Sequence, residues 1–242
     1  MPIAPGACAD LIVAARAQIA AGALGTVESI RGTWNSPIDP DTSPEWKRRR
    51  AQGGGTFFET AANLFDLWRF LLHEEIAEIF AWSRDDAHGR HQDRSAGLVA
   101  RFATGVVATA QVSAGTAHDI SIEIAGDRGR TTIAAQRFDG AAHYAPHETS
   151  GMTGPRLRRL GAFLQQLPLG VARMRRRGDY GEAYRAMWHD FADCIRRERP
   201  PACTFADGRE MLRGVLAAMQ SASKHRPVAI HRAELVRTPI VA

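Results

Sequence analysis

The sequence predicts an α+β fold: a broad, mostly antiparallel open sheet with helices packed on one face. Two observations support this. Between residues 76 and 136, segments that alternate apolar and polar residues follow one another through short loops, which is typical of antiparallel neighbours with one buried face. Helical patterns precede and follow that block, and such grouping of helices and strands indicates an α+β arrangement.

The elements before the strand block are marked by their periodicity and their breakers. The first expected helix is rich in alanine, has apolar residues at helical spacing and ends at Gly22. The expected order is a helix over 9–22, a strand over 27–35, a proline-rich loop over 36–46, a glycine run over 53–55 and a largely apolar helix over about 56–72.

The strand block and the closing elements follow. Strands are expected over 76–83, 97–103, 106–114, 118–126 and 130–136, with a hairpin turn over 126–129. The stretch 137–178 predicts a polar loop and then an amphipathic helix broken near Pro168. Helices over 179–198 and 207–224 follow, the second with Asp207 as N-cap, and a last strand is expected over 227–232.

Composition indicates a soluble globular protein of the cytoplasm. Of 242 residues, 45% are apolar and 24% charged, and no apolar run reaches the ~18 residues of a membrane span. The start of the chain lacks a secretory signal, and three irregularly spaced cysteines favour reduced thiols. The net charge of +5 gathers at 47–50, 156–159 and 173–178, which we interpret as solvated arginine. We therefore expect neither a nucleic-acid nor a membrane partner.

Polar residues line one face of the apolar helix. Glu59, Asn63 and Asp66 stand at i, i+4 and i+7, which share a face of a helix. Buried polar groups need partners, so this line faces a hydrogen-bonding network, solvent or a ligand pocket. Structural roles remain open from spacing alone: Glu59 can favour the helix N-terminus, Asn63 can bridge loops, and Asp66 can pair with Arg69.

Other residues near this helix are candidates for substrate binding. Gly54 and Gly55, in the glycine run, let the backbone approach an occupant of the pocket closely. Trp34 and Trp46 flank the region and offer aromatic faces on which a ligand ring can stack, although a core role is equally open.

No metal site is expected. The pairs His88-x-x-His91 and His143-x-x-x-His147 have ligand-like spacing but no clear third ligand.

Three segments carry a resemblance to a known family. They are "IAAGALGTVESIRGTW", "GGGTFFETAANLFDLWRFLL" and the closing stretch from "YRAMWHDF" to "KHRPVAI". In this order they resemble the C-terminal domain of the Gfo/Idh/MocA oxidoreductases, which act mostly on sugars, polyols and their derivatives. The resemblance implies a division into 1–25, the remnant helix and linker of a missing nucleotide-binding domain, and 26–242, a substrate-binding and oligomerisation domain.

The resemblance also assigns roles to residues. Glu59 stands at the family's acidic position, Asp66 at its aspartate, and Asn63 where most members place the histidine that handles the substrate's hydroxyl proton. The resemblance thus marks Glu59 and Asn63 as the catalytic positions and Asp66 as a substrate-binding residue of the same pocket. Asparagine keeps the hydrogen bond and loses the proton transfer. His73 stands where a glycine is common, which bears on the turn after the helix.

The implied function is the substrate-binding and oligomerisation domain of an oxidoreductase for a sugar, polyol or related hydroxy compound. The cofactor implied is NAD or NADP, but no glycine-rich dinucleotide fingerprint follows a strand, so the cofactor-binding residues stay unknown. We expect no activity from this chain alone, a homo-oligomer through the open sheet face, a small-molecule substrate and a separate nucleotide-binding partner chain. The alternative is a non-catalytic binding or scaffolding protein derived from the family.

Overall fold

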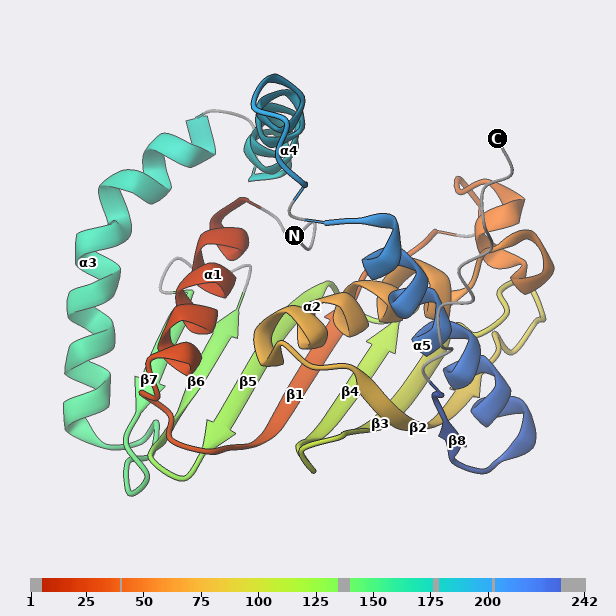
Figure 1. The fold of residues 1–242 in the computed structure, drawn as a ribbon, viewed down its shortest axis with the longest axis horizontal. Helices are drawn as coiled ribbons and strands as arrows, with labels where there is room; N and C mark the ends of the chain where they lie inside the picture. The colour runs from red at the N-terminus through yellow and green to blue at the C-terminus, as the bar shows by residue number, and fades with distance from the viewer. Residues whose placement is uncertain (1–5, 40, 135–139, 176–178, 202, 232–242) are drawn as a thin grey trace.

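The computed structural model describes residues 6–39, 41–134, 140–175, 179–201 and 203–231. These form one eight-stranded sheet with helices on one face, which confirms the predicted α+β architecture (Figure 1). The spatial order is β7-β6-β5-β1-β4-β3-β2-β8. The strands are β1 (Val27–Asn35), β2 (Ile76–Arg84), β3 (Ser95–Phe102), β4 (Val107–Ser113), β5 (Asp119–Gly126), β6 (Gly129–Ala134), β7 (Ala141–Tyr144) and β8 (Val228–Ala229).

The first strand lies inside the sheet rather than at an edge. β2, β3 and β4 pair antiparallel in sequence order, and so do β5, β6 and β7. β1 lies between β4 and β5, parallel to the former and antiparallel to the latter. Since β4 and β5 run in opposite directions, a strand inserted between them must be parallel to one. The β1–β4 pair is thus an exception to the expected antiparallel neighbours.

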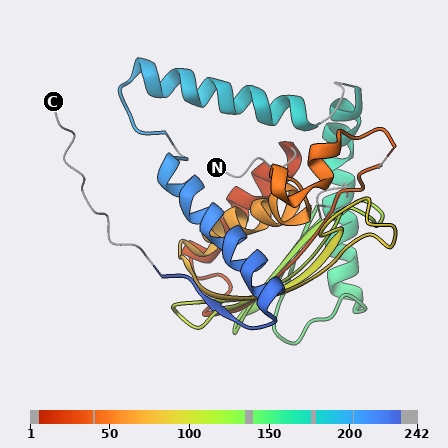
Figure 2. The same cartoon turned by 90° about the vertical axis from the view of Figure 1, so that its right-hand side faces the viewer.

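The helices form a layer over one face of the sheet. α1 (Gly6–Ala20), α2 (Ala62–Leu72) and α5 (Phe205–Lys224) cover that face (Figure 1). α3 (Thr153–Arg175) runs beside the β7 edge, and α4 (Asp179–Arg196) crosses on the far side of the helical layer from the sheet (Figure 2). No helix of the described ranges covers the other face, which we call the open face.

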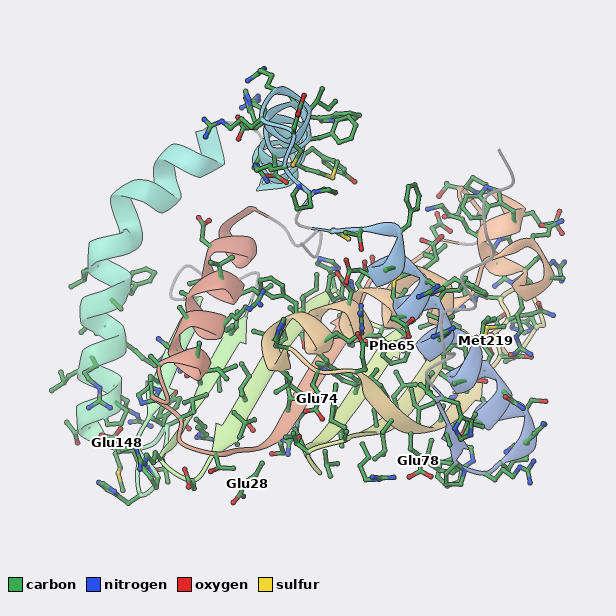
Figure 3. The ribbon with its side chains drawn as sticks, in the orientation of Figure 1. Glu28, Phe65, Glu74, Glu78, Glu148 and Met219 are labelled. Carbon is green, nitrogen blue, oxygen red and sulfur yellow. The ribbon has the colours of Figure 1, made fainter. Side chains whose placement is uncertain are left out.

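The core fills the space between the helical layer and the sheet. Figure 3 shows Phe65 of α2 and Met219 of α5 in this layer, while Glu28 and Glu78 point to the opposite side of the sheet. Phe65 and Trp68 are fully buried. Glycine permits the closest contacts: a Cβ on Gly32 of β1 would lie 2.8 Å from the Leu64 side chain. Burial of this apolar surface is the main stabilising contribution to the fold.

Some elements differ from the sequence expectation. β7 lies in a stretch expected to be a loop, because four residues suffice to extend the edge at β6 and carry little periodic signal. α3 continues through Pro168 instead of breaking there; a proline removes one helical hydrogen bond without forcing an end. Thr204, not Asp207, is the N-cap of α5, and Asp207 is the N3 partner of its capping box.

The remaining boundaries agree with expectation to within a few residues. The ends of the strands expected over 130–136 and 227–232 lie outside the described residues. Cys194 and Cys203 are free thiols. Among the described helices, none combines the length and apolar character needed to cross a membrane.

Candidate functional site

A polar pocket lies where the loop after β1 meets the start of the α2 segment. It has a volume of about 460 Å³, and we call it the Glu59 pocket. Its lining residues are Trp34, Ser36, Pro37, Ile38, Ser43, Lys47, Glu59, Thr60, Asn63 and Tyr184. The structure thus brings together Glu59, Asn63 and Trp34 of the predicted site.

Lys47 forms an ion pair with Glu59, the carboxylate of the pocket. The Nζ atom of Lys47 lies 3.6 Å from Oε2 of Glu59, and both side chains are partly exposed. The amide Nδ2 of Asn63 donates to the backbone oxygen of Glu59 at 2.9 Å, so its Oδ1 is left to accept from a ligand. The pocket therefore offers a carboxylate, an ammonium and an amide oxygen, which together can bind adjacent hydroxyl groups.

Glu59 lies on a turn of π-helix. Residues Phe57–Ala61 adopt this geometry, and the N–H of Ala62 donates to the oxygen of Phe57, five residues back. Such turns are rare and are frequent at functional sites. Glu59 lies in the π turn, whereas Asn63 lies in α2, which begins at Ala62. The geometry of the π turn therefore determines the orientation of Glu59 relative to Asn63.

The glycine run positions the lysine. A Cβ on Gly54 would lie 2.1 Å from the oxygen of Trp46 and 2.5 Å from the carbonyl of Lys47. The N–H of Gly55, whose φ is 92°, donates to the oxygen of Lys47 at 2.8 Å. Gly54 and Gly55 therefore hold the segment 46–47 against the helix. The close approach expected of them is made by the chain's own backbone, and neither residue lines the pocket.

The two tryptophans differ in position. Trp34 is 7% exposed and lines the Glu59 pocket from β1. Trp46 is 46% exposed, and its ring centroid lies 5.5 Å from the Lys47 ammonium, outside the lining of the pocket. Trp34 can offer its edge to a ligand, whereas Trp46 supports the lysine through a cation–π contact.

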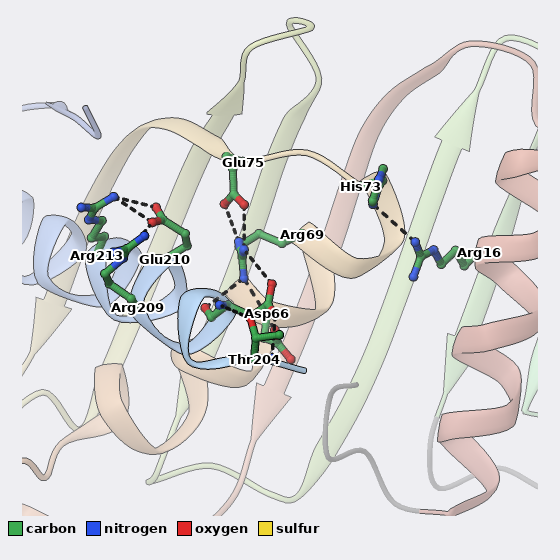
Figure 4. A network of polar contacts seen from close by, with 10 residues as sticks. Arg16, Asp66, Arg69, His73, Glu75, Thr204, Arg209, Glu210 and Arg213 are labelled. Atoms are coloured by element: carbon green, nitrogen blue, oxygen red, sulfur yellow. Dashed lines mark hydrogen bonds and ion pairs between the residues drawn. The ribbon is translucent and has the colours of Figure 1, made fainter. Parts of the chain in front are cut away.

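Asp66 lies in a different cavity. It lines a cleft of about 630 Å³ between the ends of α1 and α2, the start of β2 and the start of α5, which we call the Arg69 cleft. There the guanidinium of Arg69 contacts Asp66 at 3.8 Å, Glu75 at 2.5 Å and Asp207 at 3.7 Å (Figure 4). Asp66 therefore belongs to an ion-pair network that joins elements, and the structure does not bring it together with Glu59 and Asn63.

The pKa values of the two aspartates in this network are shifted in opposite directions. Burial raises the pKa of Asp66 above its ordinary value, with Arg69 opposing the rise. Hydrogen bonds from the hydroxyl and the backbone N–H of Thr204 hold the pKa of Asp207 below its ordinary value. Compared with an ordinary aspartate, ionisation is therefore disfavoured at Asp66 and favoured at Asp207.

Sequence reasoning missed Lys47 and Tyr184. Lys47 opens the basic run 47–50, which we interpreted as solvated charge, and Tyr184 comes from α4, far along the chain. The loop that carries Lys47 has no periodicity that predicts its contact with Glu59. In the ranges that the structure describes, no group of three or more His, Cys, Asp or Glu side chains is placed to hold a metal ion.

The described elements do not fit a dinucleotide site. Such a site needs parallel strands joined by a helix, with a glycine-rich turn at the helix N-terminus. The one parallel pair in the described sheet, β1 and β4, is joined through α2, β2 and β3, and Gly53–Gly55 contact the segment 46–47 instead. No described residue is therefore assigned to a nicotinamide cofactor.

The chain is similar to one known protein family in sequence and to several solved structures in fold. A family model described as the GFO/IDH/MocA C-terminal domain matches residues 12–132, half of the chain. The comparison with curated protein sequences gives no match.

Solved structures share the fold at low sequence identity. The WlbA dehydrogenase from Bordetella pertussis, in complex with NADH and UDP-GlcNAcA, has a TM-score of 0.71 and 15% identity over 94% of this chain and 62% of its own. A levoglucosan dehydrogenase in complex with NADH has a TM-score of 0.70 and a sequence identity of 20%, and the match covers 90% of this chain and 62% of the dehydrogenase. An oxidoreductase domain protein from Kribbella flavida has a TM-score of 0.69 and a sequence identity of 18%, and the match covers 91% of this chain and 64% of the Kribbella protein. This chain thus spans less than two thirds of each.

Proposed function

Because this chain belongs to the GFO/IDH/MocA family through its C-terminal domain, we propose that it is the substrate-binding part of an oxidoreductase for a sugar, polyol or related hydroxy compound. The observation that carries the proposal is the lining of the Glu59 pocket, where a carboxylate, an ammonium and an amide oxygen converge beside Trp34. A neutral, polyhydroxylated ligand matches this set, because the charges of Lys47 and Glu59 compensate each other.

The proton chemistry of such a reaction would rest on Glu59. An alcohol oxidation needs a group that accepts the hydroxyl proton within hydrogen-bond reach. Asn63 binds a hydroxyl without exchanging its proton, and the carboxylate of Glu59, beside Lys47, is the proton acceptor of the pocket. The cofactor, NAD or NADP as in the NADH complexes of the structural neighbours, would be supplied by a nucleotide-binding partner chain or domain.

α4 offers a surface for that partner. Its large apolar side chains form an exposed stripe, with exposed fractions of 40–66%. They are Tyr184, Met187, Trp188, Phe191 and Ile195. Aromatic residues and methionine are enriched at protein interfaces. Since Tyr184 also lines the Glu59 pocket, a nucleotide-binding domain docked on this stripe would lie next to a bound substrate.

We also propose that a second copy of the chain packs on the open face and covers it. Phe80, Trp82, Val99 and Val107 present an apolar strip there, and Trp82 is 61% exposed. Exposed apolar strips of this kind mark interfaces.

Calorimetry on the full chain tests the proposed function. We expect saturable binding of levoglucosan or myo-inositol, at least tenfold weaker in the Glu59→Gln and Asn63→Ala variants and unchanged in Asp66→Asn. We expect NADH binding only after a nucleotide-binding partner is added. Failure of a broad polyol and sugar panel to bind would contradict the proposal.

The non-catalytic alternative is favoured by Asn63 and gives a different result. A binding or scaffolding protein would take up the polyol but show no hydride transfer with any nucleotide-binding partner. The two functions therefore differ in whether NAD+ or NADP+ is reduced when the polyol and a nucleotide-binding partner are both present.

A further inference from the structure

The open face carries a hollow that the proposed function does not use. It has a volume of about 270 Å³ and lies over β1, β5 and β6, with the start of α3 as one wall. We call it the Arg31 hollow. It is lined by Arg31, Thr33, Ser121, Ile122, Glu123, Thr132, Ile133, Ala134, Gly140, Ala141, Ala142 and Arg159.

Hydroxyl groups form the floor of the hollow. Thr33 and Ser121 are register partners on β1 and β5, and Thr132 follows on β6 opposite Glu123. Because side chains alternate along each strand, all three hydroxyls point to the open face. Within the described residues, the hydroxyls of Thr33 and Ser121 make no side-chain hydrogen bond. The Thr132 hydroxyl donates to the backbone oxygen of Ala142 at 3.5 Å, so the hydroxyls of Thr33 and Ser121 are the two left to donate to a bound acceptor.

The charge of the hollow is positive. Its one carboxylate, Glu123, is already paired, since Oε2 accepts from the guanidinium of Arg130 at 3.2 Å. Arg130 in turn lies 4.7 Å over the ring of Tyr144. On the α3 wall, Nη1 of Arg159 donates to the Tyr144 hydroxyl at 3.3 Å. Glu123 is the single carboxylate among the described lining residues, and its partner is Arg130, so it does not compensate the charge of Arg31.

Arg31 is the central group of this site. It stands on the middle of β1, between Glu123 of β5 and Thr109 of β4, on the open face. Glu123 pairs with Arg130 rather than with Arg31, and no ion pair to Arg31 occurs within the described residues. A guanidinium presents a planar fork of donors that matches the paired oxygens of a phosphate or carboxylate.

We propose that the Arg31 hollow binds a small oxyanion, the phosphate or carboxylate group of a small molecule. Arg31 donates to two of its oxygens, and the hydroxyls of Thr33 and Ser121 donate from the floor. The ion pair with Arg130 reduces the repulsion between Glu123 and the anion. The site lies across the sheet from the Glu59 pocket, so it does not rest on the proposed function.

Calorimetry with inorganic phosphate tests the site, with acetate as a second arm and chloride at equal ionic strength as the baseline. We expect one phosphate per chain, bound about tenfold to a hundredfold more weakly by Arg31→Met, as for loss of hydrogen bonds to a charged group. The matched control is Arg101→Met, which removes an exposed arginine of the same face that pairs with Glu78 at 3.2 Å. It should bind phosphate like the unchanged chain.

Thermal unfolding of each variant checks that it remains folded. Binding of phosphate alone would assign a phosphoryl group, and binding of both anions an oxyanion in general. The proposal is overturned if phosphate does not bind above the chloride baseline, or if Arg31→Met and Arg101→Met bind alike.

Discussion

At the scale of single residues, an ammonium lies near Asn63, the residue that stands where the family resemblance leads us to expect a histidine. Lys47 approaches Glu59 to 3.6 Å, so the pocket has a charged donor although it has no imidazole. Asn63 holds the backbone of the π turn through Nδ2 and keeps its oxygen for a ligand. Under the proposed function, the pocket would bind a hydroxyl group through Asn63, and proton transfer would rest on the one carboxylate, Glu59.

Gly54 provides the sharpest test of this arrangement. Alanine at this position would bring a Cβ to 2.1 Å from the oxygen of Trp46, so segment 46–47 must move away and Lys47 with it. We expect Gly54→Ala to lower the free energy of unfolding by about 1–3 kcal/mol, as overpacking does. Urea denaturation measures this change, and polyol binding should weaken in the same variant.

Gly161→Ala is the matched control. Gly161 lies within α3, and a Cβ there meets nothing within 4 Å, so alanine should raise stability by up to about 1 kcal/mol. Equal effects of the two substitutions would contradict the role assigned to Gly54.

The sequence predicted part of the site at this scale. Helical spacing placed Glu59 and Asn63 in one pocket, but the same spacing also placed Asp66 with them. Asp66 is one turn further along, where Arg69 and the start of α5 surround it. Periodicity gives the face of a helix and not the neighbours that fold back onto it, and for the same reason Lys47 was missed.

At the scale of elements, the Arg69 cleft joins α2 to β2 and α5. Arg69 is 9% exposed, bonds both oxygens of Glu75 and reaches the backbone oxygen of Asp207 at 3.2 Å. A buried cation needs a compensating charge, and Glu75 is the carboxylate nearest to Arg69. The network therefore fixes the start of α5 relative to the end of α2.

The two aspartates of the cleft predict opposite effects on stability. Asp207→Asn should lower the free energy of unfolding at pH 7 by about 1 kcal/mol, through loss of part of the capping box. Because the folded-state pKa of Asp207 is depressed, its contribution is present above the ordinary pKa of aspartate and is lost as pH falls through the lower folded value. The difference between Asp207→Asn and the unchanged chain should therefore shrink in acid.

The Asp66→Asn variant should behave differently from Asp207→Asn. The pKa of Asp66 is raised by burial, so its ionised form costs stability at neutral pH, and protonation relieves that cost as pH falls through the raised value. Asparagine should leave stability at pH 7 unchanged or higher. Denaturation series at pH 7 and at pH 3–4 measure both variants, and a large loss in Asp66→Asn at pH 7 would refute this assignment.

Most elements could be predicted from sequence because their periodicity is strong. The exceptions have physical reasons: β7 is too short to show a pattern, and the π turn at Phe57–Ala61 differs from an α-helix by one hydrogen-bond step. At the end of α2, His73 has a φ of 53°, the left-handed conformation that glycine adopts most easily. This conformation is consistent with a position where the family resemblance leads us to expect glycine.

At the scale of the whole molecule, the two faces of the sheet differ in what covers them. The helical layer covers one, while the open face divides into an apolar half over β2, β3 and β4 and a polar half over β1, β5 and β6. A second copy on the apolar half would leave the arginines of the Arg31 hollow at or beside the interface.

Charge in the apolar half should prevent this association. Val99 is 45% exposed and lies between Phe80 and Thr109 in the register of the sheet. We expect sedimentation of the unchanged chain to report a dimer and Val99→Glu to report a monomer, since an unpaired charge in an interface is costly. Leu157→Glu, at a 62% exposed position on α3, should remain dimeric. A monomeric unchanged chain would refute the proposed cover.

The interior place of β1 has a consequence for folding. β1 (Val27–Asn35) finds both of its neighbours, β4 and β5, only between Val107 and Gly126. During synthesis the central strand must wait, unpaired, until roughly half of the chain has left the ribosome. Such distant pairings close large loops and slow folding. The first half of the chain is therefore the part most dependent on protection from aggregation before the sheet closes.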